Sequence, residues 1–189
     1  MGRHDRVVFL DRDGVINEAP PEGSWVLHWE GFRFAPGALE ALRRLRERGF
    51  TVAVVTNQSC IGRGLAPAEE IAGINERMAE AVAAAGGRIA GVYVCPHAKD
   101  ADCACRKPKP GLIDQASREL GLRPERAFLV GDSVRDIEAG RARGCTTILV
   151  CDLRPAGPDS AAQAEGPAPD HVVGSLAEAV ELILRLVED

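Results

Sequence analysis

Short apolar segments alternate with helical patterns along most of this chain, and this alternation restricts the fold more than any other feature. The apolar segments span residues 7–10, 51–55, 89–94, 127–130 and 146–150. Runs of this kind are typical of strands buried on both faces of a parallel sheet. Between them apolar residues recur at helical spacing, as at Leu39, Leu42 and Leu45. The order predicts an α/β fold with a doubly wound, mostly parallel sheet and right-handed crossovers, in a single domain over residues 1–189.

Two carboxylates directly follow the first apolar segment. Asp11 and Asp13 come after Val7-Val8-Phe9-Leu10 and before Gly14. In a parallel sheet the carboxyl end of a strand opens toward the ligand-binding crevice. Two carboxylates this close repel each other unless a proton or a hard divalent cation separates them. An Asp-x-Asp-Gly sequence is also an ordinary turn after a strand, so these residues alone leave both interpretations open.

Polar residues that could bind a ligand or take part in catalysis also follow the later strands. Carboxylates, hydroxyl and amide groups, and cations stand at or near these ends: Thr56, Asn57, Arg63, Arg106, Lys107, Asp132 and Asp136. Since core packing does not require such residues, and since parallel strand ends meet at one edge of a sheet, we expect them to converge. A divalent cation and a phosphate would both find ligands there, which is what phosphoryl transfer needs.

Four blocks of the sequence resemble, in order and spacing, the motifs of the haloacid dehalogenase superfamily phosphatases. The blocks are Asp11-Arg12-Asp13-Gly14-Val15-Ile16-Asn17, Thr56-Asn57-Gln58-Ser59, Lys107-Pro108 and Gly131-Asp132-Ser133-Val134-Arg135-Asp136. Each block is weak alone, but as a set they are specific and extend over nearly the whole chain. The resemblance implies a Rossmann-like core with a minimal cap, and residues 18–35 are interpreted as a flap over the carboxylates. Trp25 and Trp29 lie in this flap, where they either pack on substrate or anchor the loop.

The resemblance also implies roles for individual residues. Asp11 matches the nucleophile that forms an aspartyl-phosphate, and Asp13 matches the general acid and base. Thr56 and Lys107 match positions that stabilise the transferring phosphoryl group. Substrate binding is expected for Asn57, Gln58, Ser59, Arg63 and Arg106, although Arg63 could equally face water. The implied cofactor is Mg²⁺, held by Asp11, the backbone carbonyl of Asp13, and Asp132, with Asp136 supporting these ligands from behind.

A second metal site is predicted from four residues in one short segment. Cys95, His97, Cys103 and Cys105 form a Cys₃His set with closely paired arms. Three thiolates and one imidazole suit tetrahedral Zn²⁺, and four protein ligands indicate a closed, structural site. Residues 95–107 would then be a zinc-binding loop that delivers Arg106 and Lys107 to the pocket. The alternative is free thiols beside a surface histidine.

Composition limits the partners of the chain. The formal net charge is −5 and aromatic residues make up 4%, which disfavours a nucleic-acid surface and argues against a polynucleotide 3′-phosphatase. No apolar run approaches the about 20 residues that a membrane span needs. We expect a cytoplasmic protein with its cysteines as thiols or metal ligands, no membrane or nucleic-acid partner, and a monomeric state.

The Cys/His loop and the blocks at 56–59 and 105–111 narrow the resemblance further. They are similar to the phosphatases that remove the C7 phosphate of D-glycero-D-manno-heptose 1,7-bisphosphate in bacterial heptose nucleotide biosynthesis. Histidinol-phosphate phosphatases are near relatives and remain an alternative. A zinc-binding interaction domain without catalysis is a second alternative, which the intact Asp11, Asp13 and Lys107 disfavour.

Overall fold

The computed structural model of the chain describes residues 6–151 and 166–188. The sequence of residues 154–169 is rich in Pro, Ala, Gly and Asp and predicts a loop, most of which lies outside these ranges. Within them, none of the helices is both long and apolar enough to cross a lipid bilayer.

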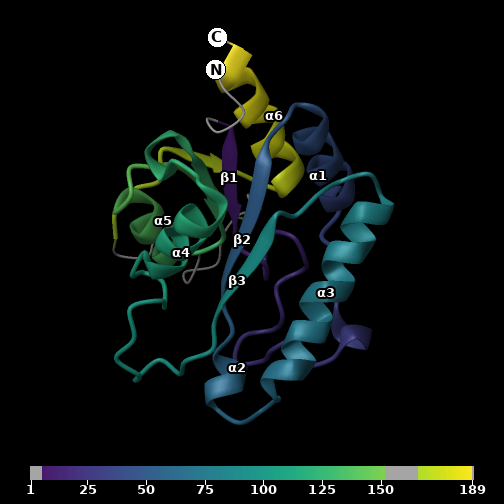
Figure 1. Ribbon diagram of the computed structural model, residues 1–189, viewed down its shortest axis with the longest axis vertical. Coiled ribbons are helices and arrows are strands. Elements are labelled where there is room, and N and C mark those ends of the chain that lie inside the picture. Colours follow the sequence, from purple (N-terminus) through teal and green to yellow (C-terminus); the bar gives the residue numbers. More distant parts are fainter. Residues whose placement is uncertain (1–5, 152–165, 189) are drawn as a thin grey trace.

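The strands form one parallel sheet, as the sequence predicts (Figure 1), and a sixth strand joins the five predicted ones. In chain order they are β1 (Val7–Leu10), β2 (Thr51–Asn57), β3 (Gly91–Cys95), β4 (Phe128–Gly131), β5 (Thr146–Val150) and β6 (His171–Val173). The spatial order is β3-β2-β1-β4-β5-β6. The second strand is longer than predicted, because Thr56 and Asn57 still pair with Val94 and Cys95 of β3.

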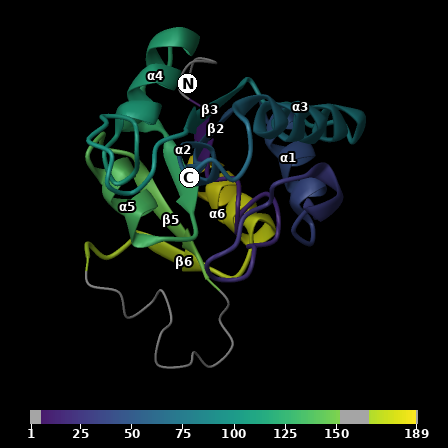
Figure 2. The same cartoon turned by 90° about the horizontal axis from the view of Figure 1, so that it is seen from below.

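Helices cover both faces of the sheet (Figures 1 and 2). The α-helices are α1 (Ala38–Glu47), α2 (Ser59–Gly62), α3 (Ala68–Ala84), α4 (Gly111–Leu120), α5 (Val134–Arg141) and α6 (Leu176–Glu188). Two short 3₁₀ helices are η2 (Trp29–Gly31) and η3 (Pro124–Arg126). Helices α1, α3 and α6 share one apolar cluster, and α4 and α5 contribute to the other. This arrangement confirms the doubly wound prediction.

The first strand shows why the chain needs both layers. Val8 and Leu10 belong to the cluster with α1, α3 and α6, while Val7 and Phe9 belong to the opposite cluster. Successive side chains of a strand point to opposite faces, so four consecutive apolar residues are all buried. Burying each one contributes roughly 1.5–3 kcal/mol, which holds β1 at the centre of the sheet.

The strand order reverses between β1 and β4, which are neighbours although β2 and β3 intervene in the sequence. Such a switch point leaves a crevice at the carboxyl ends of the two strands. Asp11 follows β1 and Asp132 follows β4, so the fold itself brings these two carboxylates to the crevice.

Ser175 and Glu178 have the spacing of a capping box, which predicts that the last helix begins after Ser175 and that Glu178 accepts from the Ser175 backbone N. The Ser175 Oγ accepts a hydrogen bond from the Glu178 backbone N at 3.2 Å, which is one half of a capping box. The Glu178 carboxylate instead accepts from the Gly174 backbone N at 2.8 Å, one residue before the predicted partner.

Candidate active site

The turn after β1 places Asp11 against the neighbouring strand. The Asp11 backbone N donates to the Val130 carbonyl of β4 at 3.0 Å, and the chain then turns sharply through Gly14 at φ +81°. A Cβ on Gly14 would lie 2.1 Å from Asp132 Oδ2. Glycine is therefore needed both for the left-handed backbone conformation and for the close approach of the Asp132 carboxylate.

Three carboxylates gather at the switch point. Asp11, Asp132 and Asp136 each offer an oxygen, and these oxygens lie within 4.8 Å of one another. Asp136 comes from the first turn of α5, where its Oδ2 accepts hydrogen bonds from the Ser133 backbone N at 3.1 Å and from Ser133 Oγ at 2.6 Å. Helix α5 thus fixes the third carboxylate behind the other two.

Lys107 is buried beside these carboxylates and links two of them. Its Nζ lies 3.0 Å from Asp11 Oδ1 and 2.5 Å from Asp136 Oδ1, and it donates to the Val55 carbonyl at 2.8 Å. Burial opposes the charge of Lys107, but Asp11 and Asp136 outweigh it and raise its pKa. Lys107 is therefore a fixed cation at the centre of the site.

Even with Lys107 present, the carboxylates carry excess negative charge. Burial, followed by repulsion from Asp136 and Asp13, raises the pKa of Asp11 to about 6 against the attraction of Lys107. Burial, with repulsion from Asp11 and Asp136, raises the pKa of Asp132 to about 8. A hard divalent cation takes oxygen ligands and would relieve this repulsion. The donor set at the switch point thus fits Mg²⁺.

The Asp13 carboxylate is not part of this group of three and is instead bound by several donors. Arg12 binds it through Nε at 3.1 Å and through Nη2 at 2.9 and 3.1 Å. Asn17 Nδ2 donates to Oδ1 at 2.9 Å, and Gln58 Nε2 donates to Oδ2 at 3.0 Å. These donors occupy the Asp13 side chain, and the Asp13 backbone carbonyl as a cation ligand stays a prediction.

The residues at the end of β2 form more hydrogen bonds within the protein than the sequence suggests. The Asn57 amide pairs with the Lys107 backbone in both directions, each at 3.1 Å, while still lining the cavity. Gln58 Nε2 also donates to Thr56 Oγ1 at 2.8 Å, and Gln58 is buried. Gln58 is not among the residues that line the cavity, and its amide binds Asp13 and Thr56. A direct contact between Gln58 and a substrate stays a prediction.

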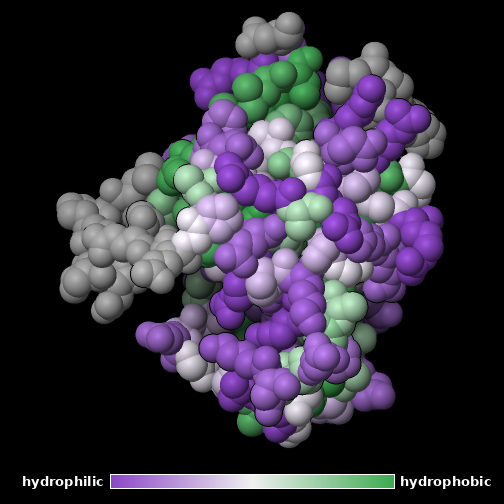
Figure 3. Space-filling model, turned by 90° about the vertical axis from the view of Figure 1, so that its left-hand side faces the viewer, coloured by the Kyte–Doolittle hydropathy of each residue, from purple (hydrophilic) through white to green (hydrophobic). Residues whose placement is uncertain are grey.

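A cavity of about 580 Å³ opens over the carboxylates. It brings together the β-strand ends, the flap and the loop that carries Lys107. Its lining residues include Asp11, Asp13, Thr56, Asn57, Ser59, Arg63, Arg106, Lys107 and Asp132. In Figure 3 the lower half of the face shown is mostly hydrophilic, at the end of the molecule where β2 runs into α2 in Figure 1.

The two tryptophans of residues 18–35 differ in position: Trp29 packs on the core, whereas Trp25 lines the cavity. Trp29 stacks on Phe32 with ring centroids 5.0 Å apart and packs on the core, so it anchors the loop. Trp25 lines the cavity, donates to Ser59 Oγ at 3.4 Å, and lies under the Arg63 guanidinium at 5.3 Å. Because Trp25 and neighbouring loop residues line the same cavity as Asp11, the segment forms a wall of the pocket.

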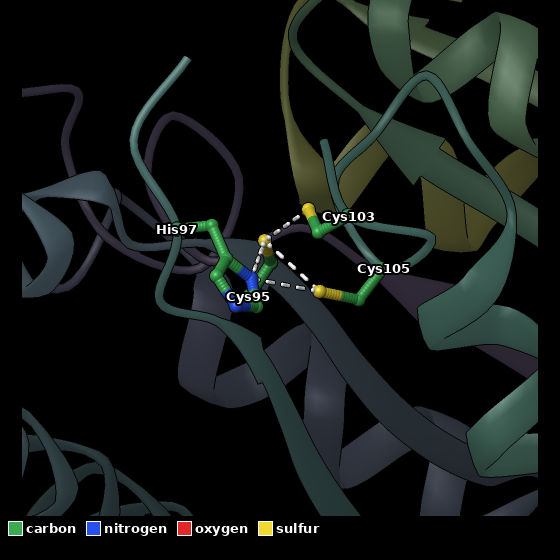
Figure 4. Close-up of side chains that lie close together, drawn as sticks. All are labelled: Cys95, His97, Cys103 and Cys105. Carbon is green, nitrogen blue, oxygen red and sulfur yellow. Dashed lines mark hydrogen bonds between the residues drawn. The ribbon is translucent and has the colours of Figure 1, made fainter. Parts of the chain in front are cut away.

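Cys95, His97, Cys103 and Cys105 converge as predicted (Figure 4). The Sγ of Cys95 lies 3.2 Å from Cys105 Sγ and 3.8 Å from Cys103 Sγ, while His97 Nδ1 lies 3.3 Å from Cys105 Sγ and 3.6 Å from Cys95 Sγ. Ligands of a tetrahedral zinc ion stand about 3.8 Å apart for two sulfurs and about 3.6 Å for sulfur and nitrogen, given the usual bond lengths. The four side chains thus fit Zn²⁺.

The Cys/His cluster is directly connected to the cavity. Arg106 follows Cys105, and its Nη1 donates to the His97 carbonyl at 3.0 Å. Arg106 also lines an adjoining cavity of about 490 Å³, together with Lys99, Lys109 and Arg135. The loop and the residues after it therefore contribute Lys99, Arg106 and Lys109 to this cavity, together with the acidic Asp100 and Asp102.

Three further residues of the site carry no role in the sequence analysis. Arg12 and Arg135 lie inside the motif blocks, each between two aspartates to which a role is assigned. Lys99 lies between the two arms of the Cys/His set. Lys99 and Arg135 line both cavities. The position of Arg12 between two aspartates is a signal that is visible in the sequence. The structure shows that Arg12 is fully buried, and a buried arginine needs an anionic partner.

Comparisons with known proteins agree with this geometry. The haloacid dehalogenase-like hydrolase family profile matches residues 22–141, and a HAD-hydrolase-like profile matches residues 104–179. The chain belongs to the haloacid dehalogenase-like hydrolase family. Membership explains why the strand ends at the switch point carry carboxylates, since phosphoryl transfer relies on positioned charge.

Proteins of similar sequence match between 78% and 96% of the chain. A D-glycero-beta-D-manno-heptose-1,7-bisphosphate 7-phosphatase of Pasteurella multocida is 37% identical over 96% of this chain and 98% of its own. A D-glycero-alpha-D-manno-heptose-1,7-bisphosphate 7-phosphatase of Mycobacterium tuberculosis is 39% identical over 78% of this chain and 80% of its own. The solved D,D-heptose 1,7-bisphosphate phosphatase of B. bronchiseptica, complexed with magnesium and phosphate, has a TM-score of 0.85 and 34% identity, covering 96% and 99% of the two chains.

Proposed function

We propose that this family member is a Mg²⁺-dependent phosphatase that removes the C7 phosphate of D-glycero-D-manno-heptose 1,7-bisphosphate. The observation that carries the proposal is the charged cavity at the switch point, in a chain that matches phosphatases of this name over 96% of its length. These relatives disfavour histidinol phosphate as the substrate, and the complete set of carboxylates and Lys107 disfavours a non-catalytic domain.

The proposed reaction has two steps. Asp11 is the nucleophile in the first step and the leaving group in the second, while Asp13 first donates and then accepts a proton. An Asp11 oxygen attacks phosphorus, and the bond from phosphorus to the sugar oxygen breaks while Asp13 gives that oxygen a proton. Water then attacks the phosphorus of the aspartyl-phosphate, Asp13 accepts the water proton, and the bond to Asp11 breaks to release phosphate. The second step restores both aspartates.

The other residues would bind and neutralise charge. Lys107 and Thr56 stabilise the transferring phosphoryl group. Mg²⁺ would be held by Asp11, the Asp13 backbone carbonyl and Asp132, with Asp136 behind them, and would supply further neutralisation of phosphate charge. Magnesium is present in the related B. bronchiseptica structure. Zn²⁺ bound by Cys95, His97, Cys103 and Cys105 would fix the loop that carries Arg106 and Lys107.

The charge of the cavity rim supports a substrate with two phosphates. Four cations line the cavity besides Lys107, namely Arg63, Lys99, Arg106 and Arg135, whereas Glu22 is the acidic residue on the flap side. Lys107 is already engaged by two carboxylates. The remaining cations are more than one phosphate needs, so the second phosphate would lie toward Arg106 and its neighbours. Arg63 and Ser59 would complete the contacts on the flap side.

The test is phosphate release with Mg²⁺ from each anomer of heptose 1,7-bisphosphate and from histidinol phosphate. We expect a clear preference for one heptose anomer. Because one similar protein is named for the β anomer and another for the α anomer, the experiment decides which anomer is preferred. Asp11→Asn should abolish turnover, whereas Asp102→Asn, on the exposed part of the zinc loop, should not. Preference for histidinol phosphate, or full activity of Asp11→Asn, would contradict the proposal.

We also propose a cytoplasmic, monomeric enzyme without a nucleic-acid or membrane partner. The net charge of −5 supports the lack of a nucleic-acid partner. Light scattering during size-exclusion chromatography tests the monomeric state, and a molar mass near twice 20.1 kDa would contradict it.

A further inference from the structure

Asn75 is a polar residue on the buried face of α3. Its neighbours on that face, Ile71, Ile74 and Met78, pack in the core, and Asn75 itself is 6% exposed. Burying an amide costs free energy unless it forms hydrogen bonds. The apolar pattern of the helix does not explain an asparagine at this position. The buried Asn75 amide therefore needs a hydrogen-bond partner elsewhere in the protein.

The partner is Arg12, which lies between the two aspartates of the first motif. Asn75 Oδ1 accepts from Arg12 Nη1 at 3.0 Å, and Arg12 is 0% exposed. The opposite edge of the same guanidinium, Nε and Nη2, binds the Asp13 carboxylate. A guanidinium is planar and rigid, so holding Nη1 in place also fixes the edge that faces Asp13.

We propose that Asn75 is a positioning residue that acts through Arg12 to fix the direction of the Asp13 carboxylate. The inference rests on the proposed function, in which Asp13 transfers the proton. Asn17 and Gln58 also hold this carboxylate, and both belong to the motif blocks at 11–17 and 56–59. Asn75 is 63 residues from Arg12 in sequence and does not line the cavity, so it ties helix α3 to proton transfer without touching substrate.

The position of Asp13 matters most when the leaving oxygen needs a proton. An alkyl oxygen, such as that of a sugar, is a poor leaving group and must receive the Asp13 proton as its bond to phosphorus breaks. A p-nitrophenyl oxygen leaves as a stable anion and does not need one. General acid catalysis typically contributes 10²–10⁴-fold, so a misdirected Asp13 should slow the alkyl ester far more than the first turnover of the aryl ester.

The experiment compares two near-isosteric variants of the full-length enzyme. Asn75→Leu removes the acceptor for Arg12, while Asn75→Asp keeps it. Met78→Leu is the matched control, because Met78 lies on the same buried face and makes no hydrogen bond to Arg12. For each protein we would measure kcat and KM with heptose 1,7-bisphosphate and the burst of p-nitrophenolate in a single turnover.

Asn75→Leu should lower kcat for the heptose ester about 10-fold or more, with KM and the p-nitrophenolate burst changed less than about 3-fold. Asn75→Asp and Met78→Leu should stay within about 3-fold of wild type on both esters. Should Asn75→Leu fail to fold, Asn75→Ser, which withdraws the acceptor from Nη1, must show the same split between the esters. An equal loss on both esters, or no loss at all, overturns the role of Asn75.

The wild-type protein separates this inference from the proposed function. If it hydrolyses glycerol 3-phosphate but not the heptose ester, only the substrate assignment is wrong, and the comparison proceeds with the glycerol ester. If it hydrolyses no phosphate ester, the proposed function and the role of Asn75 are both overturned.

Discussion

Magnesium binding should depend strongly on pH, because the carboxylates that would hold the ion are crowded. The pKa of Asp132 is raised to about 8 and that of Asp11 to about 6, in both cases first by burial. Mg²⁺ binds the ionised carboxylates. It must therefore displace protons from these groups at any pH below their pKa values.

The expected magnitude follows from the two pKa values. At pH 6 about 1% of Asp132 and about half of Asp11 are ionised, and at pH 8 the fractions are about half and nearly all. The apparent Kd for Mg²⁺ should therefore fall about 100-fold between pH 6 and pH 8, or about 2.7 kcal/mol. Above pH 8 the dependence should level off.

The same shifts affect folding of the metal-free protein. Between about pH 4 and pH 8 the folded state holds protons that the unfolded chain has already released, so the stability contributed by Asp11 and Asp132 falls as pH rises. Mg²⁺ should offset this loss most at the upper end of that range. Thermal unfolding at pH 6, 7 and 8, with and without Mg²⁺, measures the difference.

Isothermal titration of the protein with Mg²⁺ at the same pH values measures the affinity directly. Asp132→Asn is the control, because it removes the group that titrates near pH 8. It should bind Mg²⁺ more weakly and show only about a 2-fold change between pH 6 and pH 8, the part due to Asp11. A wild-type Kd that changes less than about 5-fold over this range would refute the reasoning.

Three further predictions concern single elements of the site. Lys107→Met should abolish phosphate release and destabilise the fold by about 3–5 kcal/mol, because it leaves two buried carboxylates without their cation; urea unfolding checks this, and an unchanged midpoint would contradict it. Gly14→Ala should abolish Mg²⁺ binding as seen by calorimetry, because the new Cβ would lie 2.1 Å from a carboxylate oxygen of Asp132; retained binding would show that the turn can relax. Cys103→Ser should release bound zinc, as measured by a chromogenic chelator, and make residues 95–107 more sensitive to limited protease, whereas Cys145→Ser, outside the cluster, should do neither.

The order of elements in this protein is determined by its sequence alone. Apolar runs of four to six residues are long enough for buried strands and too short for helices. The intervening helical patterns leave a parallel sheet as the arrangement that buries both. Asp11 and Asp132 could be placed at one crevice in advance, because each directly follows a strand and parallel strands end at the same edge. The Cys/His set was equally readable, since its four ligands lie within eleven consecutive residues of the sequence.

Only the tertiary structure decided what the side chains at those strand ends face. Asn57 and Gln58 follow each other at the end of β2, yet Asn57 binds the Lys107 backbone and Gln58 binds the Asp13 carboxylate. The link from Asn75 to Asp13 also needs α3 to lie against the turn after β1, where Arg12 stands. The physical reason is that sequence spacing fixes which edge of the sheet a residue reaches. The direction of its hydrogen bonds depends instead on partners that are tens of residues away and become neighbours only when the helices pack on the sheet.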